Sequence, residues 1–196
     1  MTIKYTYICS VLESEREIIK MPIPKPKNWY AIYTRAKAEK KVYEQLACSG
    51  YEAYLPLITT VRQWSDRKKK IKTPLISSYV FIKIEETKLN QVLSVYGAVR
   101  ILKYLGKNAI VKDEEINDLK LLLDNSNIHL TKTNMLLKGD EVEVVKGPLT
   151  GLKAHYVKEK NKHKIFIKIK ALNSYFGAEI PLSFVEKIKK EITVLN

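Results

Sequence analysis

The chain has 196 residues and a mass of 22.7 kDa, enough for one sizeable domain or two small ones. Lys and Arg number 35 against 21 Asp and Glu, so the formal net charge is +14 and the pI is about 9.6. Apolar residues make up 45%, which supports a packed core and excludes a mainly disordered, acidic chain. The excess positive charge makes a polyanion the first partner to consider.

Sequence signals for catalysis are absent. Cys9 and Cys48 form no CxxC pair or disulfide framework, which favours a reduced, cytoplasmic setting. The histidines are scattered, and there is no Walker A loop, GxSxG elbow or HExxH motif. No apolar stretch approaches the ~18 residues that span a bilayer. We therefore expect a cytoplasmic protein that is not an enzyme and has no cofactor, no metal and no membrane partner.

The N-terminal region is set apart by alternating prolines. Pro22, Pro24 and Pro26 cannot lie in a helix interior or a central strand. Residues 1–27 are therefore predicted to be an extension and a Pro-rich linker, with no function that the sequence reveals.

Residues 28–124 carry regular signals for a first domain. Strands or extended segments are expected over 29–33, 51–61, 79–84 and 99–105. Helices are expected over 34–49, from Thr87 to Gly97, and over 113–124. Thr34 is the expected cap of the first helix, and Tyr96 is expected on the apolar stripe of the second. The order β-α-β-β-α-β-α predicts an α+β domain with an antiparallel sheet and helices packed on one face.

The strand predicted over 79–84 has two unlike faces. Its aliphatic residues alternate with Tyr79, Phe81 and Lys83. The aliphatic face suits the core. The aromatic face either packs under the third helix or forms an exposed contact patch, and periodicity leaves both alternatives open.

The C-terminal part changes character. Residues 125–137 are predicted to be a linker because the segment is rich in Asn, Ser and Thr and lacks periodicity. Residues 138–196 hold short strands over 141–145, 152–158, 164–170 and 178–182 with turn signals between them. Short strands at this spacing predict a small all-β barrel.

Positive charge gathers at two places in the first domain, the helix predicted over 34–49, with Arg35, Lys37 and Lys41, and the segment 62–72. Residues 62–72 hold six basic residues against Asp66 alone, a net charge of +5 at a predicted hairpin tip. Such a tip suits salt-sensitive contact with phosphates, and Trp64 within it could stack on a base. The structural alternative is a solvated hairpin and helix face. The candidate nucleic-acid-binding residues are Arg35, Lys37, Lys41, Arg62, Trp64, Arg67, Lys68, Lys69, Lys70 and Lys72.

Several segments resemble one known family. GDEVEVVKGPLTG and EIPLSFVEKI resemble a KOW domain of the NusG type, an SH3-like barrel, with the turn residues Gly139, Asp140, Gly147, Pro148 and Gly151. WYAIYTRAKAEKKV, YLPLITTVRQWSDRKKK, SYVFIKI and GAVRILKYLGKNAIVKDEEI resemble the NusG N-terminal domain in order and spacing. The sequences RQWSDRKK and EIPLSFVEKI are most similar to the UpxY branch, the NusG paralogues encoded with capsular polysaccharide operons.

The resemblance implies a transcription elongation factor that acts as a monomer. It implies that residues 28–124 bind the clamp helices of the largest catalytic subunit of RNA polymerase through Tyr79, Phe81, Ile101 and Tyr104. It places the basic residues beside upstream or non-template DNA, with nascent RNA as a further candidate. A KOW domain at 138–196 would recruit a second factor, such as Rho or a ribosomal protein.

The function that this implies is antitermination, or processive elongation, within a long operon for capsular or surface polysaccharide synthesis. The alternative is a KOW-containing protein that binds RNA or the ribosome without contacting RNA polymerase.

Overall fold

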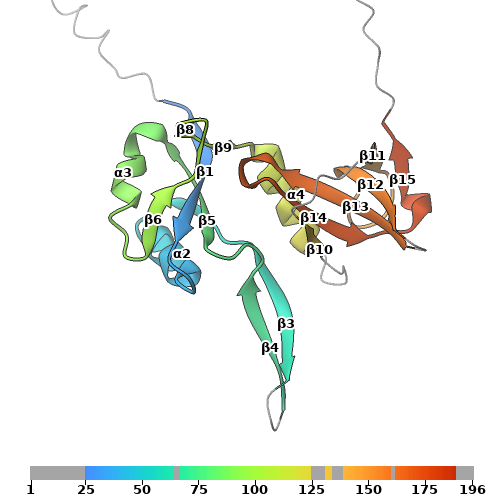
Figure 1. The fold of residues 1–196 in the computed structure, drawn as a ribbon, viewed down its shortest axis with the longest axis horizontal. Helices are drawn as coiled ribbons and strands as arrows, with labels where there is room; N and C mark the ends of the chain where they lie inside the picture. Colours follow the sequence, from blue (N-terminus) through green and yellow to red (C-terminus); the bar gives the residue numbers. More distant parts are fainter. Residues whose placement is uncertain (1–24, 64–66, 125–130, 134–138, 160–161, 189–196) are drawn as a thin grey trace, which may run out of the picture.

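The computed structural model describes residues 25–63, 67–124, 131–133, 139–159 and 162–188. Figure 1 shows a sheet with helices on one side of the view, an all-β part on the other, and helix α4 (Asp113–Asp124) between them. A long hairpin projects from the first part. The predicted fold class, an α+β domain followed by a small all-β domain, is confirmed. Most of the predicted extension, residues 1–24, lies outside the described residues.

The first sheet is built around two long antiparallel strands. They are β1 (Lys27–Thr34) and β5 (Tyr79–Glu85), in a register that places Ala31 opposite Phe81. Shorter strands flank them on both sides, in the order β2-β5-β1-β6, with β9 also paired to β1. These shorter strands are β2 (Glu52–Tyr54), β6 (Ala98–Ile101) and β9 (Ile110–Val111).

One face of this sheet is mainly aliphatic, with Tyr30 as its buried aromatic residue, and lies under α2 (Glu39–Cys48) and α3 (Leu89–Val92). Ile32 and Ile82 of the strands are fully buried there with Val42 of α2. Both helices are shorter than predicted. Thr34 still belongs to β1, where its N–H donates to the carbonyl of Ser78 at 2.9 Å, and α2 begins only after Ala38 at its N-cap position, so Thr34 does not cap it.

The second predicted helix begins as a 3-10 turn, η1 (Glu86–Lys88), and α3 ends at Val92. Tyr96 consequently lies beyond the helix and is 65% exposed, although the sequence placed it on the apolar stripe. The helix is too short to include Tyr96, and only Leu89 and Val92 of it are buried against the sheet.

The opposite face is covered by α4, whereas the sequence predicted helices on one face only. Trp29 and Phe81 lie on this face in one core cluster with Leu119 of α4. The indole Nε1 of Trp29 donates to Asp113 Oδ1 at 2.9 Å, and Lys120 Nζ lies 5.6 Å from the Trp29 ring centroid. An aromatic sheet face is too apolar to be left in water, and α4 shields it.

Two hairpins extend from the sheet. The long one pairs β3 (Leu57–Gln63) with β4 (Lys68–Pro74) along its whole length, as the sequence predicted for this basic segment. The short one pairs β7 (Lys103–Tyr104) with β8 (Lys107–Asn108) through a tight turn.

The C-terminal domain is one antiparallel sheet in the order β10-β14-β13-β12-β11-β15. A strand absent from the prediction, β10 (Thr131–Thr133), lies inside the expected linker and pairs with β14. This pairing uses main-chain groups, which the polar composition of the segment does not reveal. The remaining elements are β11 (Asp140–Val144), β12 (Lys153–Glu159), β13 (Lys162–Ile169), η2 (Lys170–Leu172), β14 (Ser174–Glu179), η3 (Leu182–Phe184) and β15 (Val185–Lys187).

Strand β13 is buried on both faces near its middle. Ile165, Ile167 and Ile169 fill the core as their alternation predicts. Phe166 points the other way, yet it is only 4% exposed. It lies opposite Gly177 of β14, where an added Cβ would come within 2.5 Å of the Phe166 ring. The glycine leaves room for the aromatic ring to lie over the neighbouring strand.

The two domains meet at α4. Glu115 is buried, and its Oε1 accepts a hydrogen bond from the main-chain N–H of Lys170 at 3.3 Å. Burial and the neighbouring Glu114 and Glu115 raise the pKa of Asp118 above its ordinary value, with Lys153 opposing the shift. One side of α4 therefore contacts the first sheet through Trp29, and another carries carboxylates beside the C-terminal all-β domain, which we call the barrel after its predicted fold. Among the described helices, none is long and apolar enough to cross a membrane.

Candidate protein and nucleic-acid interface

The predicted polymerase-binding residues do not form one exposed patch. Phe81 is fully buried under α4 and stacks against Tyr54 with ring centroids 6.4 Å apart. Ile101 is 7% exposed and belongs to the core on the α2 face. The prediction that these two residues are exposed is thus wrong. Phe81 belongs to the core on the α4 face of the sheet, and Ile101 belongs to the core on the α2 face. Tyr79 is half-buried, and Tyr104 is 68% exposed on the short β7–β8 hairpin.

An accessible aromatic patch does exist at the end of the sheet. Tyr79 meets Tyr33 edge-on with ring centroids 5.4 Å apart, and the Arg100 guanidinium lies 5.2 Å from the Tyr33 centroid. Tyr33 is half-buried and Arg100 is exposed. We call Tyr33, Tyr79 and Arg100 the Tyr33 patch. Tyr and Arg are the residues most enriched where protein interfaces hold their binding energy.

Sequence reasoning missed Tyr33 and Arg100. The strand alternation in WYAIY could have found Tyr33, since it lies on the same face as Trp29. Arg100 could not be placed this way, because its position opposite Tyr33 depends on the pairing of β6 with β1.

Tyr54 lies at the margin of this face, between the sheet and α4. Lys120 Nζ lies 5.3 Å from its ring centroid. Burial, and secondarily the charge of Asp124, raise the pKa of the Tyr54 phenol well above its ordinary value. The phenol is therefore neutral throughout the physiological pH range.

A second site gathers predicted basic residues around an exposed ring. Arg35 and Lys41 lie 5.5 and 5.2 Å from the Tyr96 ring centroid. The loops are held together by a hydrogen bond from Arg35 N–H to the Gly97 carbonyl at 2.9 Å. An added Cβ on Gly97 would lie 3.0 Å from Val42, so this close approach needs glycine. Cations beside an exposed aromatic ring offer both phosphate pairing and base stacking. Lys37, also predicted here, is exposed on the loop before α2, with φ of 64°.

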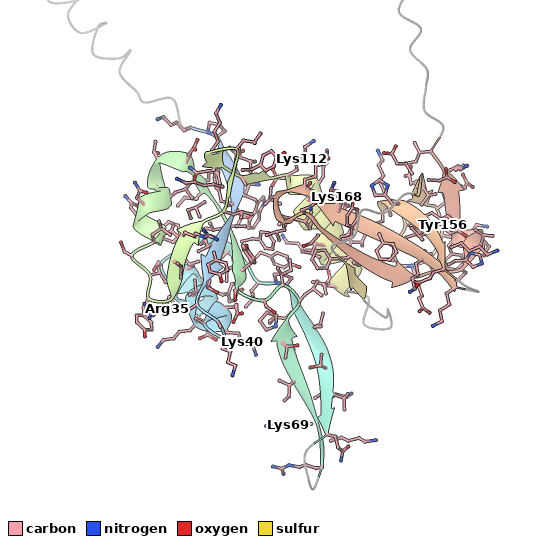
Figure 2. All side chains as sticks on the ribbon, in the orientation of Figure 1. Arg35, Lys40, Lys69, Lys112, Tyr156 and Lys168 are labelled. Atoms are coloured by element: carbon pink, nitrogen blue, oxygen red, sulfur yellow. The ribbon has the colours of Figure 1, made fainter. Side chains whose placement is uncertain are left out.

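The basic hairpin presents cations on both faces. Lys68, Lys70 and Lys72 alternate along β4 and share one face, while Lys69 lies on the other, opposite Arg62. These four lysines are exposed, as is Arg67. Figure 2 shows Lys69 near the end of the hairpin and Lys40 on the side of its base. Trp64 lies outside the described residues, and so does the tip around it.

The base of the hairpin is fastened to the first turn of α2. Lys40 Nζ donates to the carbonyl of Lys72 at 2.6 Å. The buried carboxylate of Glu39 accepts the N–H of Ser78 at 2.7 Å, just after the hairpin. Helix α2 therefore sets the position of the hairpin relative to residues 35–38, which we call the Arg35 loop.

The predicted KOW turn residues serve the geometry of the barrel. Gly147 and Gly151 have φ of 84° and 87°, and an added Cβ on Gly147 would lie 2.7 Å from the Phe184 ring. At Gly139 an added Cβ would collide with the carbonyl of Tyr156. Asp140 pairs with Lys187 at 2.9 Å across β11 and β15. Pro148 lies in the turn between Gly147 and Gly151.

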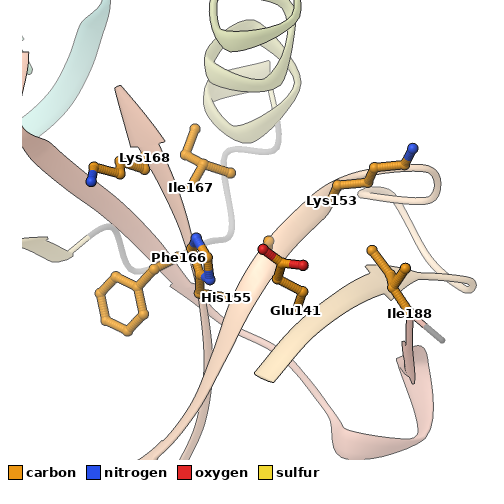
Figure 3. A pocket seen from close by; sticks show the side chains of 8 residues that line it. Glu141, Lys153, His155, Phe166, Ile167, Lys168 and Ile188 are labelled. Atoms are coloured by element: carbon orange, nitrogen blue, oxygen red, sulfur yellow. The ribbon is translucent and has the colours of Figure 1, made fainter. Parts of the chain in front are cut away.

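The barrel also has a shallow pocket of about 360 Å³ beside α4 (Figure 3). Glu141, His155 and Lys168 line it from three adjacent strands. Tyr175 supports two of them, since it meets the His155 ring edge-on and lies 5.3 Å from Lys168 Nζ. A mixed-charge pocket of this kind suits a polar protein segment.

Comparison with known proteins finds a likeness for the first domain. Residues 27–120 match the family model described as "Transcription termination factor nusG". The matched residues hold the sheet, the basic hairpin and most of α4. No curated protein matches the chain significantly.

Two solved structures illustrate the likeness. Thermotoga maritima NusG, from a study of its domain interaction, is 22% identical with a TM-score of 0.45, covering 83% of this chain and 98% of that one. An MjSpt4:Spt5 complex in conformation B is 19% identical with a TM-score of 0.28, covering 83% and 97%.

Proposed function

We propose that this protein is a NusG-like transcription factor that binds elongating RNA polymerase. The match of residues 27–120 to the NusG domain model carries this proposal. The surfaces of the domain are consistent with it, because an aromatic patch and basic elements occur on the same compact body. A factor in contact with both the enzyme and its nucleic acid needs surfaces of these two kinds.

The Tyr33 patch is the surface we assign to the polymerase clamp helices. Its tyrosines and Arg100 are accessible, whereas Phe81 and Ile101 are core residues that support the strands beneath. This revises which side chains would touch the polymerase. Of the residues that the resemblance pointed to, Tyr79 stays in the contact surface, while Tyr104 lies on the separate β7–β8 hairpin.

The Arg35 loop and the β3–β4 hairpin would lie along upstream or non-template DNA. Exposed lysines on a projecting hairpin reach phosphates without disturbing the core, and each phosphate neutralised releases counterions. Exposed Tyr96 adds a stacking surface between Arg35 and Lys41.

The finer function that we propose is processive elongation or antitermination in a long operon for capsular or surface polysaccharide synthesis. It rests on the similarity of RQWSDRKK and EIPLSFVEKI to the UpxY branch. Physically, a factor that binds the closed clamp better than the open one shifts that equilibrium by its difference in affinity. The pocket beside Glu141 and His155 is where we expect a second factor, Rho or a ribosomal protein, to bind.

The experiment is direct binding of the full chain to purified RNA polymerase core enzyme. Tyr79→Ala and Arg100→Ala are each expected to weaken binding about tenfold, within the ~1–2 kcal/mol typical of an interface anchor. Lys146→Ala, exposed in the turn after β11, is the control for the loss of a positive charge and should bind like the wild type.

Equal binding by all four proteins would overturn the assigned surface. If the wild-type chain binds free RNA or ribosomes but not polymerase, the proposed function fails. The alternative of an RNA- or ribosome-binding KOW protein then takes its place.

A further inference from the structure

A groove of about 950 Å³ runs between the short β7–β8 hairpin and the η2 end of β13. Tyr104, Leu105 and Lys107 line it from the first domain, and Lys168 and Lys170 line it from the barrel. None of the assignments above explains this groove. It belongs to neither domain alone, since each contributes only one wall.

The groove is strongly positive. Its described lining includes Lys107, Lys168 and Lys170 and no carboxylate. None of these three lysines forms an ion pair with another described residue, although lysines elsewhere, such as Lys162 and Lys164, do. Unpaired cations that converge across a concave surface favour a polyanionic ligand.

The turn of the β7–β8 hairpin places a leucine in a backbone conformation that leucine disfavours. Leu105 and Gly106 occupy its centre with φ of 49° and 80°. Such turns ordinarily carry Asn-Gly, because a left-handed conformation is costly for a residue with a bulky side chain. Here Leu105 is 84% exposed, so it gains nothing from burial. Strain of this kind in an exposed loop is typical of a binding surface.

We propose that this groove binds a short segment of single-stranded nucleic acid. The lysines would pair with successive phosphates, Tyr104 would stack on an unpaired base, and Leu105 would contact the base or sugar beside it. A duplex fits less well, because its bases are already stacked on one another and unavailable to Tyr104. The ligand would touch both walls and so favour the docked arrangement of the two domains. This proposal does not depend on polymerase binding.

The test is fluorescence anisotropy of the full chain with fluorescein-labelled ten-nucleotide oligouridylate and oligothymidylate. The Tyr104→Ala variant should bind roughly five- to a hundredfold more weakly, as for loss of one base-stacking platform, whereas Tyr104→Phe should bind nearly like the wild type. A preference between the two oligonucleotides distinguishes RNA from DNA as the source of the ligand.

Lysine variants test the charge separately. Lys168→Ala/Lys170→Ala should reduce the slope of log K against log salt by about 1.4, which corresponds to two phosphate contacts on a single strand. The matched control is Lys146→Ala/Lys158→Ala, which removes the same charge from exposed barrel sites that do not line the groove. Its slope should change much less.

A third variant separates strain from contact. Leu105→Asn should raise the melting temperature of the chain and weaken oligonucleotide binding at the same time, because Asn tolerates the left-handed conformation. Equal loss of affinity in the groove and control lysine pairs would overturn the proposal. So would tighter binding to a duplex, or displacement of the oligonucleotide by a polyglutamate peptide at lower concentration than by unlabelled oligonucleotide.

Discussion

The two faces of the first sheet come from alternate residues of the same strands, yet they are covered in different ways. The α2 face is mainly aliphatic and closed to solvent, with Tyr30, Ile32 and Ile82 fully buried. The α4 face is aromatic and only partly covered, so Phe81 is buried while Tyr33 and Tyr79 remain accessible at its end. The mainly aliphatic face, with the ring of Tyr30 inside it, is closed off as core, whereas the face whose tyrosines end beside Arg100 serves packing and recognition together.

The largest expected effect is on the free energy of unfolding, and it tests whether Phe81 belongs to the core as fully as Ile82. We expect Phe81→Ala to cost about 3–5 kcal/mol of unfolding free energy and Ile82→Ala about 2–5 kcal/mol, because both leave cavities. Urea denaturation monitored by circular dichroism measures both. Tyr79→Ala should lose clearly less, since its side chain is half-buried.

This comparison also decides how polymerase binding can be tested. A Tyr79→Ala/Phe81→Ala double variant would combine lost contact with a destabilised core, so the single Tyr79→Ala variant is the informative one. If Phe81→Ala proved as stable as the wild type, the α4 face would have to open in solution and Phe81 would return to the contact surface.

A middle-sized effect concerns the fastening of the hairpin to the α2 side. Glu39→Ala removes the acceptor for Ser78 N–H in a buried position, and we expect a loss of about 1–3 kcal/mol. Lys40→Ala removes an exposed contact to the Lys72 carbonyl and should change stability by less than about 0.5 kcal/mol. Thermal unfolding of both variants measures the difference. Equal losses would mean that the exposed contact matters as much as the buried one.

The smallest effects distinguish the two sides of α4 by their response to pH. Hydrogen bonding from Lys83, and also from Trp29, holds the pKa of Asp113 below its ordinary value. Its stabilising contribution is present above the unfolded-state pKa and is lost as the pH falls through the folded-state pKa. The pKa of Asp118 is raised, so the sign is opposite, and stability is gained as the pH falls through that raised value.

Melting temperatures between pH 7 and pH 3 test this contrast. Asp113→Asn should lower the melting temperature at pH 7 and leave a shallower decline in acid. Asp118→Asn should raise the melting temperature at neutral pH and remove the gain on acidification. The contrast fails if Asp118→Asn lowers the melting temperature at pH 7 as Asp113→Asn does.

Much of the local structure could be predicted from the sequence. The helix over 113–124, the strand over 79–84 and the basic hairpin follow from periodicity and turn residues, and the structure confirms them. The strand predicted over 99–105 is instead divided into β6 and β7, which pair with different partners, and the strand predicted over 178–182 is β14, which ends at Glu179. Errors arose where a tertiary hydrogen bond or a short element competed with local signals. Thr34 is held in β1 by Ser78, and α3 stops before Tyr96. The strand β10 was missed because main-chain pairing leaves no mark on side-chain pattern.

The candidate sites divide in the same way. The sequence alone determined the basic hairpin and the alternation that separates Phe81 from Ile82, because charge and period-two patterning are local properties. It placed Arg35 in a helix, whereas the structure has it in the loop before α2. Only the tertiary structure decided that α4 covers Phe81, that Arg100 meets Tyr33, and that Tyr104 faces barrel lysines. Periodicity shows which residues share a face. What covers that face depends on contacts between residues far apart in the chain, which no local pattern specifies.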